Sequence, residues 1–203
     1  MKIICVGRNY AQHTKELNNE LPKEPVLFLK PESAILLKRL PFFYPDFSKD
    51  VHYEAELVVK INRVGKHIDA KFAHKYYNEL TVGIDFTARD LQSQLKGKGL
   101  PWEKAKAFDG SAALGKWVDK SEIKNPNNMK FELMVNGISK QIGESAQMLF
   151  SIDTLISEIS KYFTLKIGDL IFTGTPAGVG PVSKSDQLTA YLENRKLLDL
   201  KIK

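Results

Sequence analysis

Apolar and polar residues alternate along most of this chain, and short helical patterns interrupt the alternation. Alternation with a period of two is typical of β-strands. It predicts strands at residues 2–6, 26–30, 34–37, 53–61, 80–85, 131–135, 138–142, 170–173, 187–193 and 197–202. Apolar residues that recur every three or four positions predict short helices at residues 11–17, 70–77, 87–95 and 152–163. Many strands and few, short helices indicate a β-rich α+β fold rather than a doubly wound sheet.

Three local signals refine these boundaries. Asn136-Gly137 separates two alternating runs, which is a strong signal for a two-residue β-hairpin turn. Asn194-Arg195 is expected to turn a second hairpin near the C-terminal end of the sequence. Ser151 directly precedes the helix predicted at residues 152–163, and we expect its hydroxyl to cap that helix.

The composition is that of a soluble globular protein: 203 residues, 43% apolar and 27% charged. Neither a repeat nor a linker divides the sequence, so we expect a single domain over residues 1–203. The net charge is +6 and the pI about 9.2. This excess is spread evenly and forms no basic tail, which argues against nucleic-acid binding and favours a mild field that attracts small anions.

The only cysteine, Cys5, excludes an internal disulfide and a cysteine-rich zinc site. It lies in an apolar run, so we expect it to be buried. The N-terminal residues show no signal peptide, and no apolar run approaches the roughly 20 residues of a membrane helix. These features predict a cytoplasmic protein that makes no contact with a membrane.

Three acidic residues are candidates for a metal site. Glu54 and Glu56 share one face of the strand predicted at residues 53–61. A solvated outer face is the simpler explanation, but Val58 continues the same face and adjacent like charges repel. Asp85 ends the next predicted strand and is able either to cap the following helix or to add a third ligand. Three carboxylates from two strands suit Mg²⁺ or Mn²⁺ better than zinc.

Three further features bear on catalysis. His13 and Glu16 have helical i,i+3 spacing, which suits either a surface contact or a base oriented by a carboxylate. Lys106 has apolar neighbours, which allow a partly enclosed ammonium facing the acidic residues. The glycine-rich residues 174–181 lack a Gly-Lys-Ser/Thr ending, and Pro176 and Pro181 block a following helix. We therefore expect a structured loop beside a site rather than a nucleotide-binding loop.

Taken together and in order, these segments resemble the fumarylacetoacetate hydrolase family. The resemblance is to its small, single-domain acylpyruvate hydrolase and oxaloacetate decarboxylase-like members. The matching segments are GRNYAQH (residues 7–13), EPVLFLKP (24–31), HYEAEL (52–57), GIDFTARDLQ (83–92), GLPWEKAKAFD (99–109), VNG (135–137) and TGTPAGVGP (173–181). Several collinear motifs make the resemblance specific, since none of them would do so alone.

The resemblance implies a homodimer built on a mixed β-sheet roll with short peripheral helices. It implies that Glu54, Glu56 and Asp85 hold Mg²⁺ or Mn²⁺. His13 and Glu16 would form a catalytic dyad on a lid, and Lys106 would contact the substrate or a metal-bound water. Arg89, Gln92 and Thr175 match positions that line the substrate pocket, whereas Phe28 and Lys30 lie near the site without a catalytic role.

The implied activity is metal-dependent hydrolysis of a carbon–carbon bond. An acylpyruvate such as acetylpyruvate or fumarylpyruvate would be cleaved to pyruvate and a carboxylic acid, and oxaloacetate would be decarboxylated through the same enolate. His13, supported by Glu16, would deprotonate the attacking water. One alternative is an isomerase or tautomerase of unsaturated 2-oxo dicarboxylates, which requires no water-activating dyad. The non-enzymatic alternative is a protein that binds anions or nucleic acid.

Overall fold

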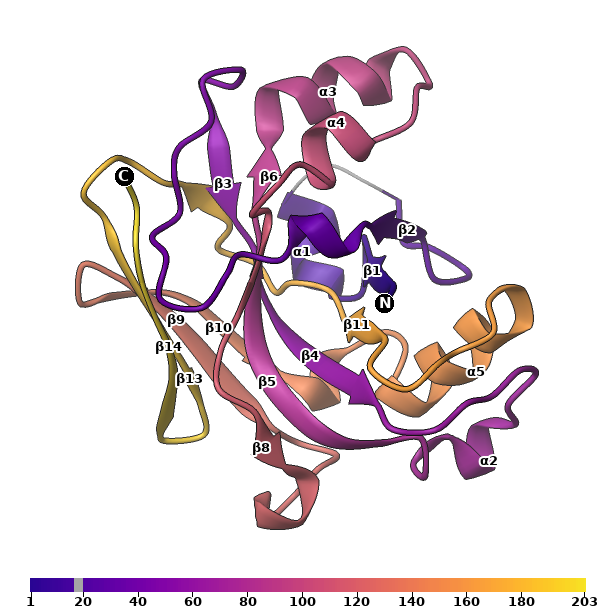
Figure 1. Ribbon diagram of the computed structural model, residues 1–203. Helices are drawn as coiled ribbons and strands as arrows, with labels where there is room; N and C mark the ends of the chain where they lie inside the picture. Colours follow the sequence, from indigo (N-terminus) through magenta and orange to yellow (C-terminus); the bar gives the residue numbers. More distant parts are fainter. Residues whose placement is uncertain (17–19) are drawn as a thin grey trace.

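The computed structural model describes residues 1–16 and 20–203, and a curled, mixed seven-stranded sheet lies at its centre (Figure 1). The strand order is β2-β1-β11-β4-β5-β7, and β8 also pairs with β5. Strands β1 and β11 run parallel, and the other neighbours are antiparallel. The strands are β1 (Ile3–Val6), β2 (Leu27–Lys30), β4 (Ala55–Ile61), β5 (Tyr77–Asp85), β7 (Ala112–Leu114), β8 (Val118–Asp119) and β11 (Leu170–Phe172). This confirms the predicted β-rich fold.

Two smaller sheets complete the strand framework. A four-stranded sheet has the order β10-β9-β13-β14 and packs against β4 and β5 (Figure 1). A three-stranded sheet has the order β12-β3-β6. Their strands are β3 (Val51–Tyr53), β6 (Thr87–Ala88), β9 (Lys130–Val135), β10 (Ile138–Glu144), β12 (Gly180–Pro181), β13 (Gln187–Leu192) and β14 (Arg195–Lys201).

Short helices cover the two ends of the large sheet (Figure 1). Helix α5 (Ile152–Tyr162) packs with α2 (Ala70–Ala73) at one end. Helices α3 (Arg89–Gly97) and α4 (Glu103–Lys106) pack together at the other, where β4 begins and β5 ends. Helix α1 is Ala11–Glu16, and the single turns of 3-10 helix are η1 (Glu32–Ala34), η2 (Lys120–Glu122) and η3 (Ser145–Gln147).

Strand β4 is buried on both faces because two hydrophobic cores lie on opposite sides of the large sheet. Leu57, Val59 and Ile61 belong to the larger core, which includes apolar residues of the four-stranded sheet and α5. Val58 belongs to a smaller core with Cys5 and with residues of β1 and β11. Because side chains alternate along a strand, Glu56 points to the same side as Val58. The smaller-core side of the sheet is therefore the side that carries the acidic residues.

The local turn and cap signals are largely confirmed. Ile138 pairs with Val135, and Asn136 and Gly137 take φ values of 53° and 79°, as a tight hairpin turn requires. Ser151 caps α5 by accepting a hydrogen bond from the Thr154 N–H at 3.2 Å. In the second hairpin Leu192 pairs with Arg195, so the turn residues are Glu193 and Asn194, one position earlier than predicted.

Several predicted boundaries are wrong. Residues 34–37 form no strand, because η1 ends at Ala34 and the Leu36 N–H bonds the Ala112 carbonyl of β7 at 2.9 Å. The helix predicted at 70–77 ends at Ala73, since Tyr77 already pairs with Ile61 at the start of β5. The helix predicted at 87–95 starts two residues later, because Thr87 and Ala88 pair with β3.

The remaining boundary differences lie close to the candidate site. The strand predicted at residues 53–61 is interrupted at Glu54, which separates β3 from β4. Asp85 does not cap α3, whose N-cap residue is Ala88. Cys5 is fully buried as expected, and burial raises the pKa of its thiol. The predicted helix end at Leu17 lies outside the described residues.

No helix in the described part of the chain has both the length and the apolar composition needed to span a bilayer.

Candidate active site and metal centre

The three predicted metal ligands come together at the end of the large sheet. Glu54, Glu56 and Asp85 each offer a carboxylate oxygen, and these oxygens lie within 4.8 Å of one another. Glu56 lies on β4 and Asp85 on the adjacent strand β5, while the Asp85 N–H bonds the Glu54 carbonyl at 2.8 Å. All three residues are buried, with 5% or less of their surface exposed. Buried carboxylates require cationic partners, which the surrounding elements supply in part.

Among the described residues, two cationic side chains hold Glu54, one at each oxygen of its carboxylate. Lys106 Nζ on α4 lies 2.8 Å from both Glu54 Oε2 and Asp85 Oδ2. Arg89 at the start of α3 donates from its terminal nitrogen to Glu54 Oε1 at 2.5 Å. Burial opposes ionisation of Glu54, but Lys106 and Arg89 outweigh it and hold the pKa of the carboxyl well below its usual value. Burial likewise opposes the charge on Lys106, but Asp85 and Glu54 raise its pKa.

Lys30, which the resemblance placed near the site without a catalytic role, pairs directly with one of the predicted metal ligands. Its side chain is fully buried, and its Nζ lies 2.8 Å from Asp85 Oδ1 and 2.9 Å from the Ser111 hydroxyl. It also donates to the Lys106 carbonyl and so joins β2 to α4. The ion pair between Lys30 and Asp85 was not predicted. The available signal was the alternation along β2, which places Lys30 on the same face as Phe28 and away from solvent.

Glu56 differs from the other two acids because no cationic side chain among the described residues pairs with it. Its Oε2 accepts a hydrogen bond from the Gly174 N–H at 2.7 Å. Burial, followed by the charges of Asp85 and Glu54, raises its pKa well above the usual value. A positive charge placed beside Glu56 would remove this penalty. Because the donor set contains only carboxylate oxygens, the residues fit a hard divalent cation such as Mg²⁺ or Mn²⁺.

The predicted dyad is assembled on α1. His13 Nδ1 lies 3.1 Å from Glu16 Oε2, and the Gly178 N–H bonds Glu16 Oε1 at 3.1 Å. A carboxylate only accepts hydrogen bonds, so Nδ1 carries the proton, and in the neutral imidazole Nε2 then holds the free lone pair. His13 is only 3% exposed and lies near enough to Glu54 to lower the pKa of that acid when protonated. The dyad is therefore close to the acidic triad.

The predicted substrate-binding residues divide into two groups. Arg89 and Gln92 lie together beside the triad, and Arg89 donates to Gln92 Oε1 at 2.5 Å. Thr175 lies in the glycine-rich loop, and its hydroxyl donates to the Ala55 carbonyl at 2.9 Å and accepts from Gln141 at 2.8 Å. The Thr175 hydroxyl is thus already hydrogen-bonded within the protein. A substrate contact of these three residues stays a prediction.

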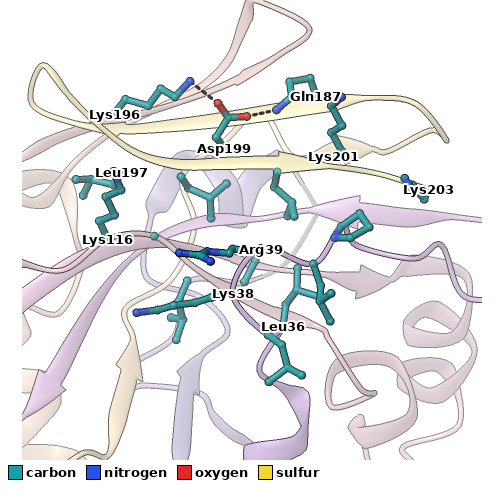
Figure 2. Close-up of a pocket in the computed structure, with 18 residues that line it drawn as sticks. Leu36, Lys38, Arg39, Lys116, Gln187, Lys196, Leu197, Asp199, Lys201 and Lys203 are labelled. Carbon is teal, nitrogen blue, oxygen red and sulfur yellow. Dashed lines mark hydrogen bonds and ion pairs between the residues drawn. The ribbon is translucent and has the colours of Figure 1, made fainter.

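A hollow of about 800 Å³ lies away from this cluster, between residues 36–41 and β14 (Figure 2). Leu36, Leu40 and several basic side chains line it, including Arg39 and Lys116, and Lys196 pairs with Asp199 at its rim. None of the predicted site residues is among its lining residues. The chemistry suggested by the acidic triad therefore belongs to the buried cluster and not to this hollow.

Comparison with known proteins decides the family. The model of the fumarylacetoacetate (FAA) hydrolase C-terminal family matches residues 2–203. The chain belongs to the fumarylacetoacetate hydrolase family. Its large curled sheet with few short helices is accordingly the fold of this family, as the resemblance implied.

Curated relatives cover most of the chain. The family member named mitochondrial oxaloacetate tautomerase from Bos taurus is 42% identical over 99% of this chain and 90% of its own length. A mitochondrial oxaloacetate decarboxylase from Dictyostelium discoideum is 47% identical over 89% of this chain and 84% of its own length. Both names describe enzymes that act on oxaloacetate.

A solved structure of the family carries a third activity in its title. The fumarylpyruvate hydrolase from Pseudomonas aeruginosa, in complex with Mn²⁺ and pyruvate, is 35% identical and superposes with a TM-score of 0.94. The match covers 100% of this chain and 89% of that one. The chain is thus a member of an enzyme family whose named reactions include tautomerisation, decarboxylation and hydrolysis.

Proposed function

We propose that this chain is a divalent-metal-dependent enzyme that acts on a small dicarboxylic 2-oxo acid through its enol. Charge balance in the buried site supports this substrate class. Among the described residues Lys30, Lys106 and Arg89 face three carboxylates, so the protein part is nearly neutral when all six groups are ionised. A divalent cation adds two positive charges and a dicarboxylate supplies two negative ones. Since buried net charge is costly, a dianion suits the site better than a monoanion.

Glu54, Glu56 and Asp85 would hold the cation. When bound, a divalent cation supplies a Lewis acid that stabilises negative charge on the oxygens of an enolised 2-oxo acid. His13 serves as the base, because Glu16 keeps its Nδ1 protonated and leaves Nε2 free to accept a proton. Lys106 and Arg89 fix the orientation of Glu54 from two sides. The low exposure of His13 keeps bulk water away from the transferred proton.

The first candidate reaction is tautomerisation of oxaloacetate. In this reaction His13 takes the proton of the enol hydroxyl and returns a proton to C3 of the substrate, so that the keto form results with the same atoms and His13 ends in its starting state. The oxaloacetate tautomerase named among the relatives supports this choice, since it is 42% identical over almost the whole chain.

The second candidate reaction is hydrolysis of an acylpyruvate of the fumarylpyruvate type, with decarboxylation of oxaloacetate as a related activity. The His13–Glu16 dyad favours hydrolysis, because an oriented imidazole is able to take a proton from an attacking water. The fumarylpyruvate hydrolase structure supports the same candidate.

One substrate panel separates these reactions. Oxaloacetate is supplied as the enol, and loss of the enol absorbance in the ultraviolet is compared with release of CO₂ in the presence of Mg²⁺ or Mn²⁺. Release of pyruvate is measured with fumarylpyruvate and with acetylpyruvate. We expect the dianions to be preferred over acetylpyruvate by about tenfold or more in kcat/KM. Equal kcat/KM for acetylpyruvate contradicts the charge argument, and absence of turnover with all three substrates contradicts the proposed function.

The role of the base is tested by His13→Ala, with His74→Ala as a matched control on the exposed end of α2. His13→Ala should lower kcat by about 100-fold or more, the usual scale for loss of a general base. The control should retain the wild-type rate. Retention of activity in His13→Ala means that α1 has only a structural role.

A homodimer and a cytoplasmic location are part of the same proposal. Light scattering after size exclusion tests the first, with a mass twice the 23.0 kDa of the chain as the expected result. A monomer that retains full activity contradicts it. Cell fractionation tests the location.

A further inference from the structure

Gln141 is a buried amide in an otherwise exposed stretch of strand β10. It is 1% exposed, whereas its neighbours Lys140 and Ile142 face solvent. The pairing of β10 with β9 shifts register between Ser139 and Gln141, which marks a β-bulge at this point. Bulges re-aim a side chain relative to a regular strand, and this one turns Gln141 toward the large sheet.

The amide of Gln141 makes three hydrogen bonds at the edge of the candidate site. Its Oε1 accepts from the Ala55 N–H at 2.9 Å. Its Nε2 donates to the Thr175 hydroxyl at 2.8 Å and to the Pro176 carbonyl at 2.9 Å. Thr175 in turn donates to the Ala55 carbonyl at 2.9 Å. Both polar groups of the Ala55 backbone are therefore bonded by this pair of side chains.

The position of Ala55 explains why these bonds matter. Strand β11 pairs with β4 only as far as Val58, and the Thr173 N–H reaches the Leu57 carbonyl just beyond. Past that point no strand among residues 1–16 and 20–203 continues along this edge of β4, and the side chains of Gln141 and Thr175 bond its backbone instead. Ala55 lies between Glu54 and Glu56 in the chain. The Ala55 backbone, which Gln141 and Thr175 hold, therefore sets the direction of two predicted metal ligands.

The same amide fixes the loop that holds the dyad. At the start of the loop at residues 174–178, the Gly174 N–H donates to Glu56 Oε2 at 2.7 Å. At the end of this loop, the Gly178 N–H donates to Glu16 Oε1 at 3.1 Å. Gln141 bonds the middle of this loop, at Thr175 and Pro176. A displacement of the loop would therefore disturb a metal ligand and the carboxylate of the dyad together.

We propose that Gln141 is a positioning residue that aligns the metal ligands and the His13–Glu16 dyad through Ala55 and the loop at residues 174–178. The inference rests on the proposed function, because it assigns a role in the same site. Gln141 itself pairs with backbone groups and the Thr175 hydroxyl, so it acts through these groups and takes no direct part in proton transfer.

The test replaces Gln141 with Met, which has a similar length but makes no strong hydrogen bonds. Gln147→Met is the matched control, since Gln147 follows the same strand and is exposed. Calorimetric titration with Mn²⁺ alone measures cation binding, and steady-state kinetics with oxaloacetate measure kcat and KM. Circular dichroism and thermal unfolding establish that each variant is folded.

We expect Gln141→Met to bind Mn²⁺ at least about tenfold more weakly and to lose kcat by a larger factor than KM changes. Gln141→Glu keeps an acceptor for the Ala55 N–H and should recover part of the Mn²⁺ affinity. Gln147→Met should match the wild type. If Gln141→Met does not fold, Gln141→Glu decides the question by the same two measurements.

The outcomes separate the two proposals. Absence of Mn²⁺ binding in the wild type overturns the proposed function. Wild-type Mn²⁺ affinity and kcat in a folded Gln141→Met protein, with only a lower unfolding temperature, overturn the positioning role and leave the proposed function standing.

Discussion

Removal of the Lys30 ammonium is the perturbation whose size follows most directly from the structure. Lys30 is fully buried, pairs with Asp85 at 2.8 Å and bonds Ser111 at 2.9 Å. Lys30→Met keeps most of the side-chain volume but leaves Asp85, within the described part of the chain, with one cationic partner instead of two. Breaking a buried ion pair by removing one partner costs about 3–5 kcal/mol. That is a large share of the roughly 5–15 kcal/mol that stabilises a folded domain.

The measurements are thermal unfolding and urea unfolding of wild type and Lys30→Met in excess chelator, because a bound cation would stabilise the folded state. For a chain of this length each kcal/mol lowers the unfolding temperature by about 2–4 °C, so a drop of roughly 6–20 °C is expected. Lys161→Met is the control, since its pair with Glu158 is on the surface, and its unfolding midpoint should not change measurably. A loss below about 1 kcal/mol in Lys30→Met refutes the buried ion pair.

Three further predictions follow from particular contacts. Glu54→Gln and Asp85→Asn should weaken Mn²⁺ binding in calorimetry. Glu79→Gln is the control, since Glu79 lies in a half-exposed pair with Lys60, and it should bind Mn²⁺ like the wild type. Wild-type affinity in Glu54→Gln and Asp85→Asn means that the ligands are misassigned. Gly178→Ala should lower kcat by about tenfold or more and should also weaken Mn²⁺ binding, because a Cβ there would lie 2.3 Å from the Lys140 carbonyl and displace the loop that holds Glu16 and Glu56. Wild-type kcat and Mn²⁺ affinity in this variant contradict the prediction. Burial opposes ionisation of Asp169, but hydrogen bonds from Lys2 and Lys166 outweigh it and lower the pKa of the carboxyl. The wild type should therefore be more stable than Asp169→Asn by the full amount above about pH 4, and this advantage should vanish as the pH falls through the folded-state pKa. A pH-independent difference between the two proteins in urea unfolding contradicts this.

The acidic triad was predictable because strand alternation is a short-range property. The spacing of Glu54 and Glu56, with Val58 on the same face, predicted two carboxylates on one side of a strand, and Asp85 ends the strand that pairs with it. The dyad was predictable for the same reason, since i,i+3 spacing on a helix brings His13 to Glu16.

The rest of the site depends on contacts between distant segments. Strands β1, β11 and β4 separate β2 from β5 in the sheet order, so Lys30 reaches Asp85 only because the sheet curls, and Gln141 reaches Ala55 from a different sheet. No local pattern reports such contacts. The same cause explains the incorrect strand at residues 34–37, where Ile35 forms only an isolated bridge to Ala112 of β7 and the apolar side chains pack into the two cores.

The central claim is that the buried acidic triad works only with a divalent cation. The most direct measurement is the rate of loss of the oxaloacetate enol with chelator-treated protein, before and after addition of Mg²⁺ or Mn²⁺, with a protein-free sample at each metal concentration. The rate should fall to the protein-free value after chelation and return when the metal is restored. A full rate in the metal-free protein would contradict the account.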